Sequence, residues 1–226
     1  MNVAIIAAAG QGTRMAGKRP KQFLELAGTP IIFHTLKAFE RCEAINEIIV
    51  VVAAAERAWF ESRVEDYGVQ KIRAVVDGGA TRAESVLHGL QAAERGADIV
   101  AVHDAVRPFV TSEEIARTLT AARLGGAAIL VSPPVDTIKE IEEARVVRTL
   151  RRADLRNALT PQCFTYKLLR QAYQAVDVLD PDLTDESSLV ERLGVKIAIV
   201  EGNGRNIKIT RPEDILIGEA ILKGWS

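Results

Sequence analysis

The sequence alternates short apolar runs with amphipathic stretches, and this alternation restricts the chain to one class of fold. Runs rich in Val, Ile and Ala are typical of strands buried on both faces, and they occupy residues 2–9, 45–54, 71–79, 98–109 and 127–135. Between them, apolar residues recur at helical spacing in 30–42, 55–68, 81–96 and 111–126. The pattern predicts an α/β fold of Rossmann-like type: a mostly parallel, twisted sheet flanked by helices on both faces.

The starts of three helices are predicted by capping boxes, in which Thr is followed three positions later by Glu. These pairs are Thr81 with Glu84, Thr111 with Glu114, and Thr210 with Glu213. Gly68 is expected to end the helix at 55–68. Beyond the alternating region we expect helices near 165–177 and 184–193, a strand at 196–202, and a last helix from Thr210.

A segment at about 133–157 breaks the alternation. It begins with a double proline and then mixes β-branched and charged residues, which predicts a protruding β-arm that is polar on both faces. Such an arm has no apolar face to bury against its own core, so we expect it to pair with another subunit. The sequence therefore predicts a single domain over 1–226 with a dimerisation arm.

Charge and composition narrow the range of partners. The formal net charge is -1, which argues against broad binding to nucleic acid or a membrane surface. No apolar run approaches the ~20 residues of a membrane span, and the first residues lack the pattern of a signal peptide. The chain has 2 cysteines and 3 histidines, which favours neither a disulfide framework nor a multi-histidine metal site. We expect a cytoplasmic protein.

Ligands of open parallel sheets bind beyond the carboxyl ends of the strands, and here the loops at those ends are rich in charge. Cations occur at Arg14, Lys21, Arg82, Arg107 and Lys208, and carboxylates at Asp104 and Asp136. This set suits a phosphate chain, because Arg and Lys form charge-assisted bonds to it. Gly10 and Gly12 would let backbone N–H groups approach phosphate oxygens. Asp104 could hold or orient a magnesium ion carried by the phosphates.

Several common chemistries fit less well. The first loop is not a Walker A sequence, and Met15 stands where the dinucleotide fingerprint needs a small residue. A dinucleotide-dependent dehydrogenase nevertheless stays an alternative, as does a nucleotide sensor without catalysis. There is no Ser-His-Asp or Cys-His set; His103 is either a base or a structural hydrogen-bonding group. A phosphate monoester would need no base, because it is already an anionic nucleophile that can attack the α-phosphorus of a nucleoside triphosphate.

These residues lie in motifs that resemble one family, 2-C-methyl-D-erythritol 4-phosphate cytidylyltransferase of the non-mevalonate route to isoprene units. The resemblance covers nearly the whole chain, in the order AAAGQGTRM, PKQFLELAGTPI, VDGGATRAESV, VHDAVRPF, PPVDTIK, ALTPQCF, LTDESSLVE and VEGNGRNIKITRPEDI. It implies a transferase that moves CMP from CTP to 2-C-methyl-D-erythritol 4-phosphate and releases pyrophosphate, with Mg²⁺ or another divalent cation.

The resemblance also implies the residues of the CTP site. They are Ala8, Ala9, Gly10, Gly12, Thr13, Arg14, Lys21, Gly79, Arg82, Ser85, Asp104 and Lys208. The first loop and Lys21 would surround the triphosphate, whereas Gly79, Arg82 and Ser85 would surround cytosine and ribose. Arg14 and Lys21 would stabilise charge at the α-phosphate, so they are counted as catalytic together with Arg152 and Lys208. Ala80 replaces an acidic residue common in the family.

The acceptor site implied by the resemblance consists of Asp104, Arg107, Thr137, Arg152, Thr160 and Lys208. Family members are homodimers with crossed arms, so Thr137 and Arg152 would reach the neighbour's site. Arg152 is preferred for its distance from Thr160, with Arg151 as the alternative. Val106 replaces an alanine common in the family, a form shared with ribitol-5-phosphate cytidylyltransferases. That activity stays the alternative function, although the first loop and the PPVDT and ALTPQCF motifs favour methylerythritol phosphate.

Overall fold

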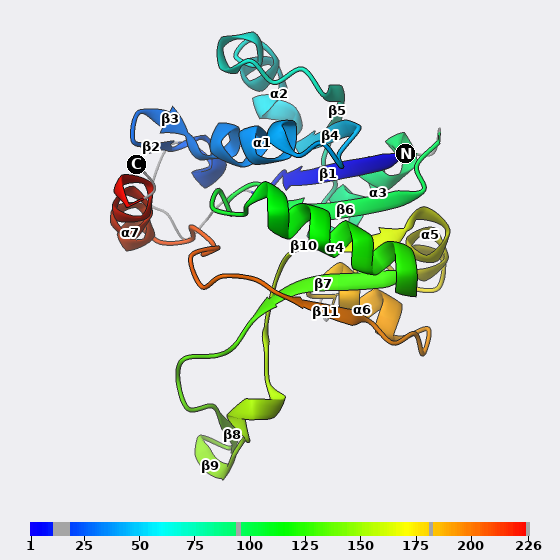
Figure 1. The fold of residues 1–226 in the computed structure, drawn as a ribbon, viewed down its shortest axis with the longest axis vertical. Coiled ribbons are helices and arrows are strands. Elements are labelled where there is room, and N and C mark those ends of the chain that lie inside the picture. The colour runs from blue at the N-terminus through cyan, green and yellow to red at the C-terminus, as the bar shows by residue number, and fades with distance from the viewer. Residues whose placement is uncertain (11–18, 94–95, 181–182, 225–226) are drawn as a thin grey trace.

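A seven-stranded sheet crosses the centre of the molecule (Figure 1), in the order β11-β7-β10-β6-β1-β4-β5. The structure, a computed structural model, describes residues 1–10, 19–93, 96–180 and 183–224. The strands are β1 Asn2–Ala8, β4 Glu47–Val52, β5 Ile72–Asp77, β6 Ile99–Asp104, β7 Ala127–Ser132, β10 Asn157–Thr165 and β11 Ala198–Glu201. All neighbours pair in parallel except β10, which runs antiparallel to β6 and β7.

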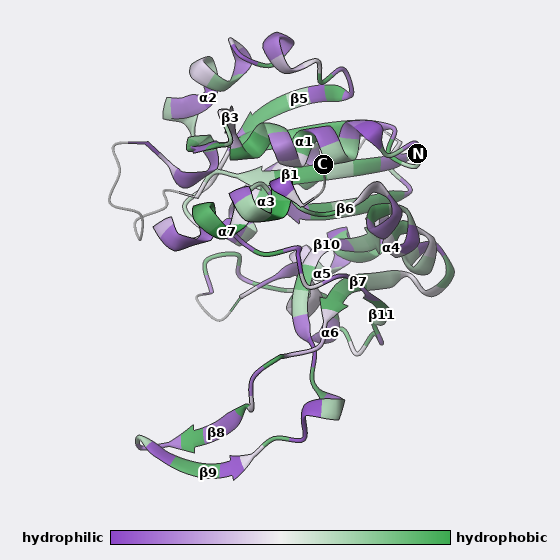
Figure 2. Ribbon diagram, turned by 60° about the vertical axis from the view of Figure 1, so that its left-hand side comes forward, coloured by the Kyte–Doolittle hydropathy of each residue, from purple (hydrophilic) through white to green (hydrophobic). Residues whose placement is uncertain are grey.

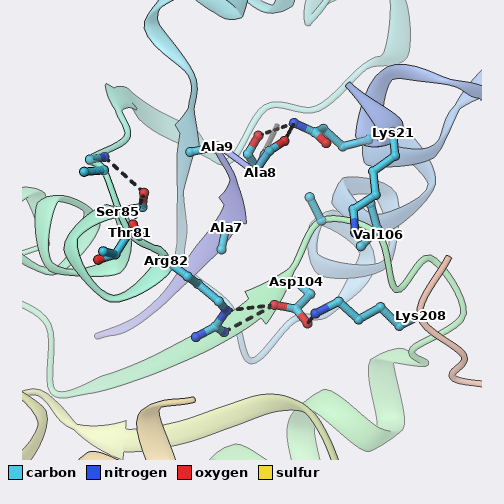
Figure 3. Close-up of a pocket in the computed structure, with 15 residues that line it drawn as sticks. Ala7, Ala8, Ala9, Lys21, Thr81, Arg82, Ser85, Asp104, Val106 and Lys208 are labelled. Carbon is cyan, nitrogen blue, oxygen red and sulfur yellow. Dashed lines mark hydrogen bonds and ion pairs between the residues drawn. The ribbon is translucent and has the colours of Figure 1, made fainter. Parts of the chain in front are cut away.

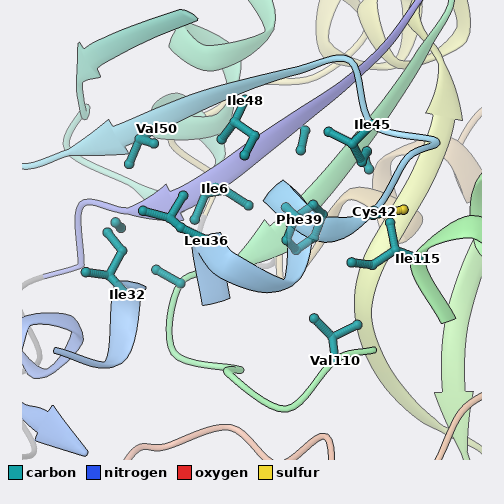
Figure 4. Close-up of a cluster of buried hydrophobic side chains, with 14 of the residues drawn as sticks. Ile6, Ile32, Leu36, Phe39, Cys42, Ile45, Ile48, Val50, Val110 and Ile115 are labelled. Carbon is teal, nitrogen blue, oxygen red and sulfur yellow. The ribbon is translucent and has the colours of Figure 1, made fainter. Parts of the chain in front are cut away.

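Helices cover both faces of the sheet because the side chains of each strand alternate between faces. Ala4, Ile6 and Ala8 of β1 pack in one cluster with the first set of helices, α1 Ile31–Arg41 and α4 Ser112–Gly125 (Figure 4). Ile5 lies in a cluster on the other face, where the helices are α3 Arg82–Ala92, α5 Tyr166–Gln174 and α6 Glu186–Glu191. The predicted α/β class is confirmed.

Two capping boxes were predicted where α3 and α4 begin, and one of them forms completely. Thr111 accepts from the backbone of Glu114, whose carboxylate accepts from the Thr111 backbone at 2.9 Å. At α3, Thr81 accepts from the Glu84 backbone at 3.0 Å, but the Glu84 carboxylate bonds the N–H of Ala80 instead. This second box is therefore shifted by one residue.

The third predicted box is wrong by one position. Helix α7, Pro212–Lys223, begins after Thr210, and Asp214 rather than Glu213 accepts the backbone N–H groups of Thr210 and Arg211, at 2.7 and 2.8 Å. The N-cap is Arg211 and not Thr210, so the third helical position, from which a side chain reaches back, falls on Asp214.

The second predicted helix is shorter than expected. Helix α2, Ala54–Glu61, gives way to a turn and a 3₁₀ helix, Glu65–Tyr67. Gly68 ends this segment with φ of 66°, a left-handed conformation that glycine adopts without strain. The predicted stop at Gly68 is therefore correct, but it ends a 3₁₀ helix and not α2.

The antiparallel strand β10 is the main element that the sequence pattern missed. It lies between β6 and β7 in the middle of the sheet, and it contains Pro161. Proline argues against a central strand because it lacks a backbone donor. The register shifts between Ala158 and Gln162, so the irregular pairing around Pro161 accommodates the missing N–H.

The predicted arm is present over 133–157. It consists of a hairpin, β8 Lys139–Glu142 with β9 Arg145–Thr149, and a 3₁₀ helix, Arg152–Asp154. Figure 2 shows the arm standing away from the sheet, with hydrophobic and hydrophilic residues interleaved along both strands. Every residue of the two arm strands is exposed, including Ile141, Val146 and Val147, so the prediction of an arm polar on both faces is wrong. Across the residues that the structure describes, none of the helices is both long and apolar enough to span a bilayer.

Helix α7 fixes the loop that precedes it against the body. Ile215, Ile221 and Leu222 of this helix pack on a cluster that includes Phe109 and the fully buried Ile209. Ile209 also donates its N–H to the Val106 carbonyl at 2.9 Å. The loop is thus held beside the end of β6, where the charged residues lie. A hairpin of two short strands, β2 Glu25–Leu26 and β3 Thr29–Pro30, packs next to α7.

Candidate active site

A cavity of about 360 Å³ opens at the carboxyl edge of the sheet, where the parallel strands β1, β5 and β6 end (Figure 3). The residues around it come from segments far apart in the sequence: Ala7, Ala8, Ala9, Gly10, Lys21, Gln22, Gly79, Ala80, Thr81, Arg82, Ser85, Asp104, Ala105, Val106 and Lys208. The structure therefore brings together most of the residues predicted for the CTP site. Gly12, Thr13 and Arg14, also predicted there, lie outside the described residues.

Small residues at the end of β1 leave the cavity open on one side, and Gln22 holds this segment in place. Its side-chain amide donates to the carbonyls of Ala8 and Gly10, at 2.5 and 3.0 Å. Gln22 is almost fully buried in the 3₁₀ helix Lys21–Phe23. Its neighbour Lys21 extends into the cavity (Figure 3). Sequence reasoning gave Gln22 no role, because a buried glutamine leaves no pattern in a single sequence.

The turn between β5 and α3 lies against the end of β1. A Cβ atom on Gly78 would come within 2.2 Å of the Ala9 Cβ, so only glycine permits this approach. Ser85 holds the following residues, 79–81, in place. Its hydroxyl accepts the N–H of Gly79 at 3.0 Å and donates to the Thr81 carbonyl at 2.8 Å. The two loops form one wall of the cavity.

Asp104 is the electrostatic centre of the site. Lys208 lies 2.8 Å from its carboxylate, the guanidinium of Arg82 at 3.2 Å, and that of Arg107 at 3.6 Å. Burial by itself would raise the pKa of Asp104, but the three cations outweigh burial and hold that pKa well below its usual value. The carboxylate is therefore ionised at neutral pH, and it orients side chains from α3, the β6 loop and the loop before α7.

A second buried carboxylate, Glu186, holds Arg82 from the other side. Arg82 forms a bidentate pair with Glu186 at 2.7 and 3.0 Å, and Tyr173 donates to Glu186 at 3.2 Å. Burial alone would lower the pKa of Arg82, but Glu186 and Asp104 together raise it. Glu186 lies in the LTDESSLVE motif, but the sequence did not predict a role for it. The only feature that pointed to Glu186 was an acidic residue at the start of a predicted helix.

The predicted acceptor residues Arg107 and Thr160 contact Asp104 but do not line the cavity. Thr160 accepts the Asp104 N–H at 3.3 Å, and Arg107 donates to the carbonyl of Asn206 at 2.9 Å. Both side chains approach Asp104 from elements other than those that carry Lys21 and Gly79. The site thus has two halves that meet at Asp104.

His103 is the structural hydrogen-bonding group of the two alternatives. It is fully buried, its ring is 4.9 Å from the Phe39 ring, and Nε2 donates to the Arg107 carbonyl at 3.1 Å. Burial lowers the pKa of His103 to about 4, with Arg107 and Lys208 contributing in the same direction. A neutral, inaccessible imidazole is not placed to take a proton from a substrate.

Thr137 and Arg152 are not brought to this cavity. Both lie exposed on the arm, and Arg152 donates to the Val135 carbonyl within the arm at 2.7 Å. Arg151, the alternative, pairs loosely with Asp154 at 3.8 Å. Figure 1 shows the arm projecting away from the body that carries the cavity. Within one chain, therefore, the arm residues and the rest of the predicted acceptor site lie apart.

Asp104 was predicted to hold or orient a magnesium ion carried by the phosphates of CTP, and that role stays a prediction; its surroundings do not by themselves form a site for a resident metal ion. Both of its oxygens face cations. Among the described residues, no group of three or more His, Cys, Asp and Glu side chains is arranged to hold a metal. Mg²⁺ needs about six oxygen ligands, and among the described residues that line the cavity only Asp104 supplies a carboxylate.

The mostly parallel sheet, the small residues Ala8, Ala9 and Gly79 in the cavity wall, and the two lysines that line the cavity fit an α/β nucleotidyltransferase. A sequence model of the 2-C-methyl-D-erythritol 4-phosphate cytidylyltransferase family matches residues 2–224. The chain belongs to this family.

Individual relatives agree with this assignment. The chain is 45% identical over 222 residues to 2-C-methyl-D-erythritol 4-phosphate cytidylyltransferase of Bacillus mycoides, covering 98% of each chain. It resembles the crystal structure of 4-diphosphocytidyl-2C-methyl-D-erythritol synthase from Anaerococcus prevotii with a TM-score of 0.87 at 34% identity, covering 98% of this chain and 96% of that one. For the cytidylyltransferase from Thermus thermophilus the TM-score is 0.77 at 32% identity, with 97% and 98% covered.

Proposed function

We propose that the cavity beside β1 binds CTP and that the Arg107 side of Asp104 binds the acceptor. The chain is a cytidylyltransferase that transfers CMP from CTP to 2-C-methyl-D-erythritol 4-phosphate. The observation that supports this placement best is the ion pair of Lys208 with Asp104 at 2.8 Å, inside a cavity that Lys21 also lines. Lys21 is suited to bind the triphosphate of CTP, and Lys208, beside Asp104, is suited to bind the phosphate of the acceptor.

The reaction needs positioning and positive charge more than proton transfer. A phosphate oxygen of the acceptor attacks the α-phosphorus of CTP, and the bond from that phosphorus to the bridging oxygen breaks. Pyrophosphate leaves with the electron pair. Lys21 and Arg14 are proposed to stabilise the charge on the α-phosphate, with backbone groups of Gly10, Gly12 and Thr13 around the triphosphate.

The nucleoside half of CTP is proposed to lie against Ala8, Ala9, Gly79 and Ser85. Those residues line the cavity wall and offer backbone groups suited to reading a base. The Arg82 guanidinium already binds the carboxylates of Glu186 and Asp104. We therefore propose that Arg82 shapes this wall by holding Asp104 in place. A divalent cation is proposed to enter with the triphosphate, because the described residues do not form a metal site of their own.

The acceptor phosphate is proposed to be held by Lys208 and by Arg152 of a second subunit, with Thr137 from the same arm. The exposed apolar residues of the arm support a homodimer: Val135 at 84%, Ile141 at 67%, Val146 at 62% and Val147 at 55%. Apolar side chains on a projecting hairpin are suited to a partner surface.

We also propose a cytoplasmic location, which agrees with the buried thiols of Cys42 and Cys163, neither of which is in a disulfide.

The test is pyrophosphate release from CTP and Mg²⁺ with 2-C-methyl-D-erythritol 4-phosphate, ribitol 5-phosphate or no acceptor. We expect release only with the first. Release only with ribitol phosphate would keep the chemistry and change the acceptor, whereas CTP binding without release would indicate a nucleotide sensor.

A further inference from the structure

The loop that carries Lys208, residues 202–211, has no regular secondary structure, yet it is fixed at several points. Gly202 donates to the Val131 carbonyl at 2.8 Å, and Asn203 donates through its side chain to Glu114 at 2.9 Å. These contacts hold the first part of the loop to β7 and α4. The part that reaches the active site is held by a different residue, Asn206.

Asn206 joins three segments of the acceptor half. Its side-chain amide donates to the Thr160 carbonyl at 3.0 Å, and its own carbonyl accepts from Arg107 at 2.9 Å. Lys208 follows two residues later and pairs with Asp104. Asn206 thus contacts Arg107 and Thr160, two residues of the acceptor site, and lies two residues before the third, Lys208.

The burial of Asn206 shows that this arrangement is specific. Its exposed fraction is 1%, and within the described structure its Oδ1 atom has no hydrogen-bond partner. A buried polar atom without a partner is destabilising, so Oδ1 does not account for the choice of asparagine here. An asparagine at this position is explained by what its amide donor holds in place.

We infer that Asn206 is a positioning residue for the acceptor, a role that rests on the proposed function. It acts through Arg107, Thr160 and Lys208 and does not touch the substrate itself. The hydrogen bond from its side-chain amide to the Thr160 carbonyl of β10 sets the distance between Lys208 and the residues Arg107 and Thr160. A displacement of about 1 Å in such a group costs up to about 100-fold in rate.

The test replaces Asn206 by Leu, which keeps the volume and removes the amide. Pyrophosphate release is measured with CTP saturating and 2-C-methyl-D-erythritol 4-phosphate varied, and CTP binding is measured separately by calorimetry without acceptor. We expect kcat/KM for the acceptor to fall by about 10- to 100-fold. The Kd of CTP should change far less, because the nucleoside wall and Lys21 are untouched. The melting temperature should fall moderately, because Leu leaves the Thr160 carbonyl without its donor, so the kinetics are measured well below it.

The control is Asn203→Leu, the same substitution in the same loop, which removes the side-chain hydrogen bond to Glu114 of α4 and the one from the Arg205 N–H. It should leave the acceptor kinetics nearly unchanged; an equal loss would mean that any loosening of the loop suffices, and would overturn the proposal. Unchanged acceptor kinetics in Asn206→Leu, or an equal loss of CTP affinity, would overturn it too.

Asn206→Ala repeats the test if the Leu variant does not fold. Loss of the fold in both variants would assign Asn206 to stability and refute the inference. Inactivity of the wild-type protein with this acceptor would instead refute the proposed function, so the two failures are distinguishable.

Discussion

At the scale of single residues, Asp104 and its partners decide what the site can do. One carboxylate pairs with cations from three segments, and Glu186 balances the charge of Arg82 from behind. The cationic residues were predictable, because they follow strand ends in the sequence. Glu186, Gln22 and Asn206 were not, because buried polar residues act through partners that only the folded chain brings near them.

The role of Lys21 can be tested at this scale. Lys21→Ala should lower kcat by about 100- to 1,000-fold, because it removes a cation from the place where charge develops in the transition state. Circular dichroism and the melting temperature should match the wild type. Lys196→Ala, at an exposed lysine away from the cavity, serves as the control. Turnover within the range of that control would exclude Lys21 from the chemistry.

His103 predicts a pH dependence of stability. Its pKa falls from 6.5 in the unfolded chain to about 4 in the folded protein, so the unfolded state binds the proton more readily. Stability is full above pH 6.5 and declines as pH falls toward 4, by on the order of 3 kcal/mol in all. Asp104, whose pKa is lowered from 3.8, adds its own loss only below about pH 4.

Urea unfolding between pH 7 and 4.5 covers the titration of His103 before that of Asp104 begins. His34, whose pKa is also lowered by burial, contributes over the same range, so the comparison needs a variant at His103. His103→Gln keeps a donor for the Arg107 carbonyl but cannot be protonated, so its stability should vary less over this range. Parallel pH profiles for the two proteins would show that other groups cause the acid loss.

At the scale of elements, the site depends on how closely loops from different strands approach. The contact of the β5–α3 turn with the end of β1 requires glycine at position 78, and β10 enters the sheet between β6 and β7 with Pro161 in it. The parallel strands and the loops at their ends were predictable from periodicity. The position of β10 was not, because local sequence argues against a central strand there.

Gly78→Ala should destabilise the protein by about 1–3 kcal/mol, because its Cβ would lie 2.2 Å from the Ala9 Cβ. CTP affinity should fall as well, since the two loops wall the cavity. Gly125→Ala is the control, because a Cβ there meets nothing within 4 Å. Chemical denaturation and CTP titration measure both effects. Adding Ala9→Gly should restore part of the stability; no recovery would place the strain elsewhere.

At the scale of the whole molecule, the arm separates Arg152 and Thr137 from the cavity of their own chain. If the arm completes a neighbour's site, two defective chains should complement each other. Lys21→Ala damages the body and Arg152→Ala damages the arm, so a mixed dimer has one site built from an intact body and an intact arm. Random pairing of equal amounts should recover about a quarter of wild-type activity, because half of the dimers are mixed and each has one good site.

The measurement is pyrophosphate release after the two variants are mixed, unfolded and refolded together, with each variant refolded alone as the control. Activity no greater than the sum of the two single variants would mean that the arm does not act across subunits. Arg151→Ala in place of Arg152→Ala tests the alternative arm residue in the same way.

The sequence by itself determined the class of fold, the edge of the sheet where the site lies, and most of the residues that line it. Periodicity and strand-end loops are local properties, so they can be read without coordinates. The tertiary structure decided the pairing of β10, the roles of Glu186, Gln22 and Asn206, and the separation of the arm from the cavity. Each of these depends on contacts between residues distant in the chain, which no local pattern encodes.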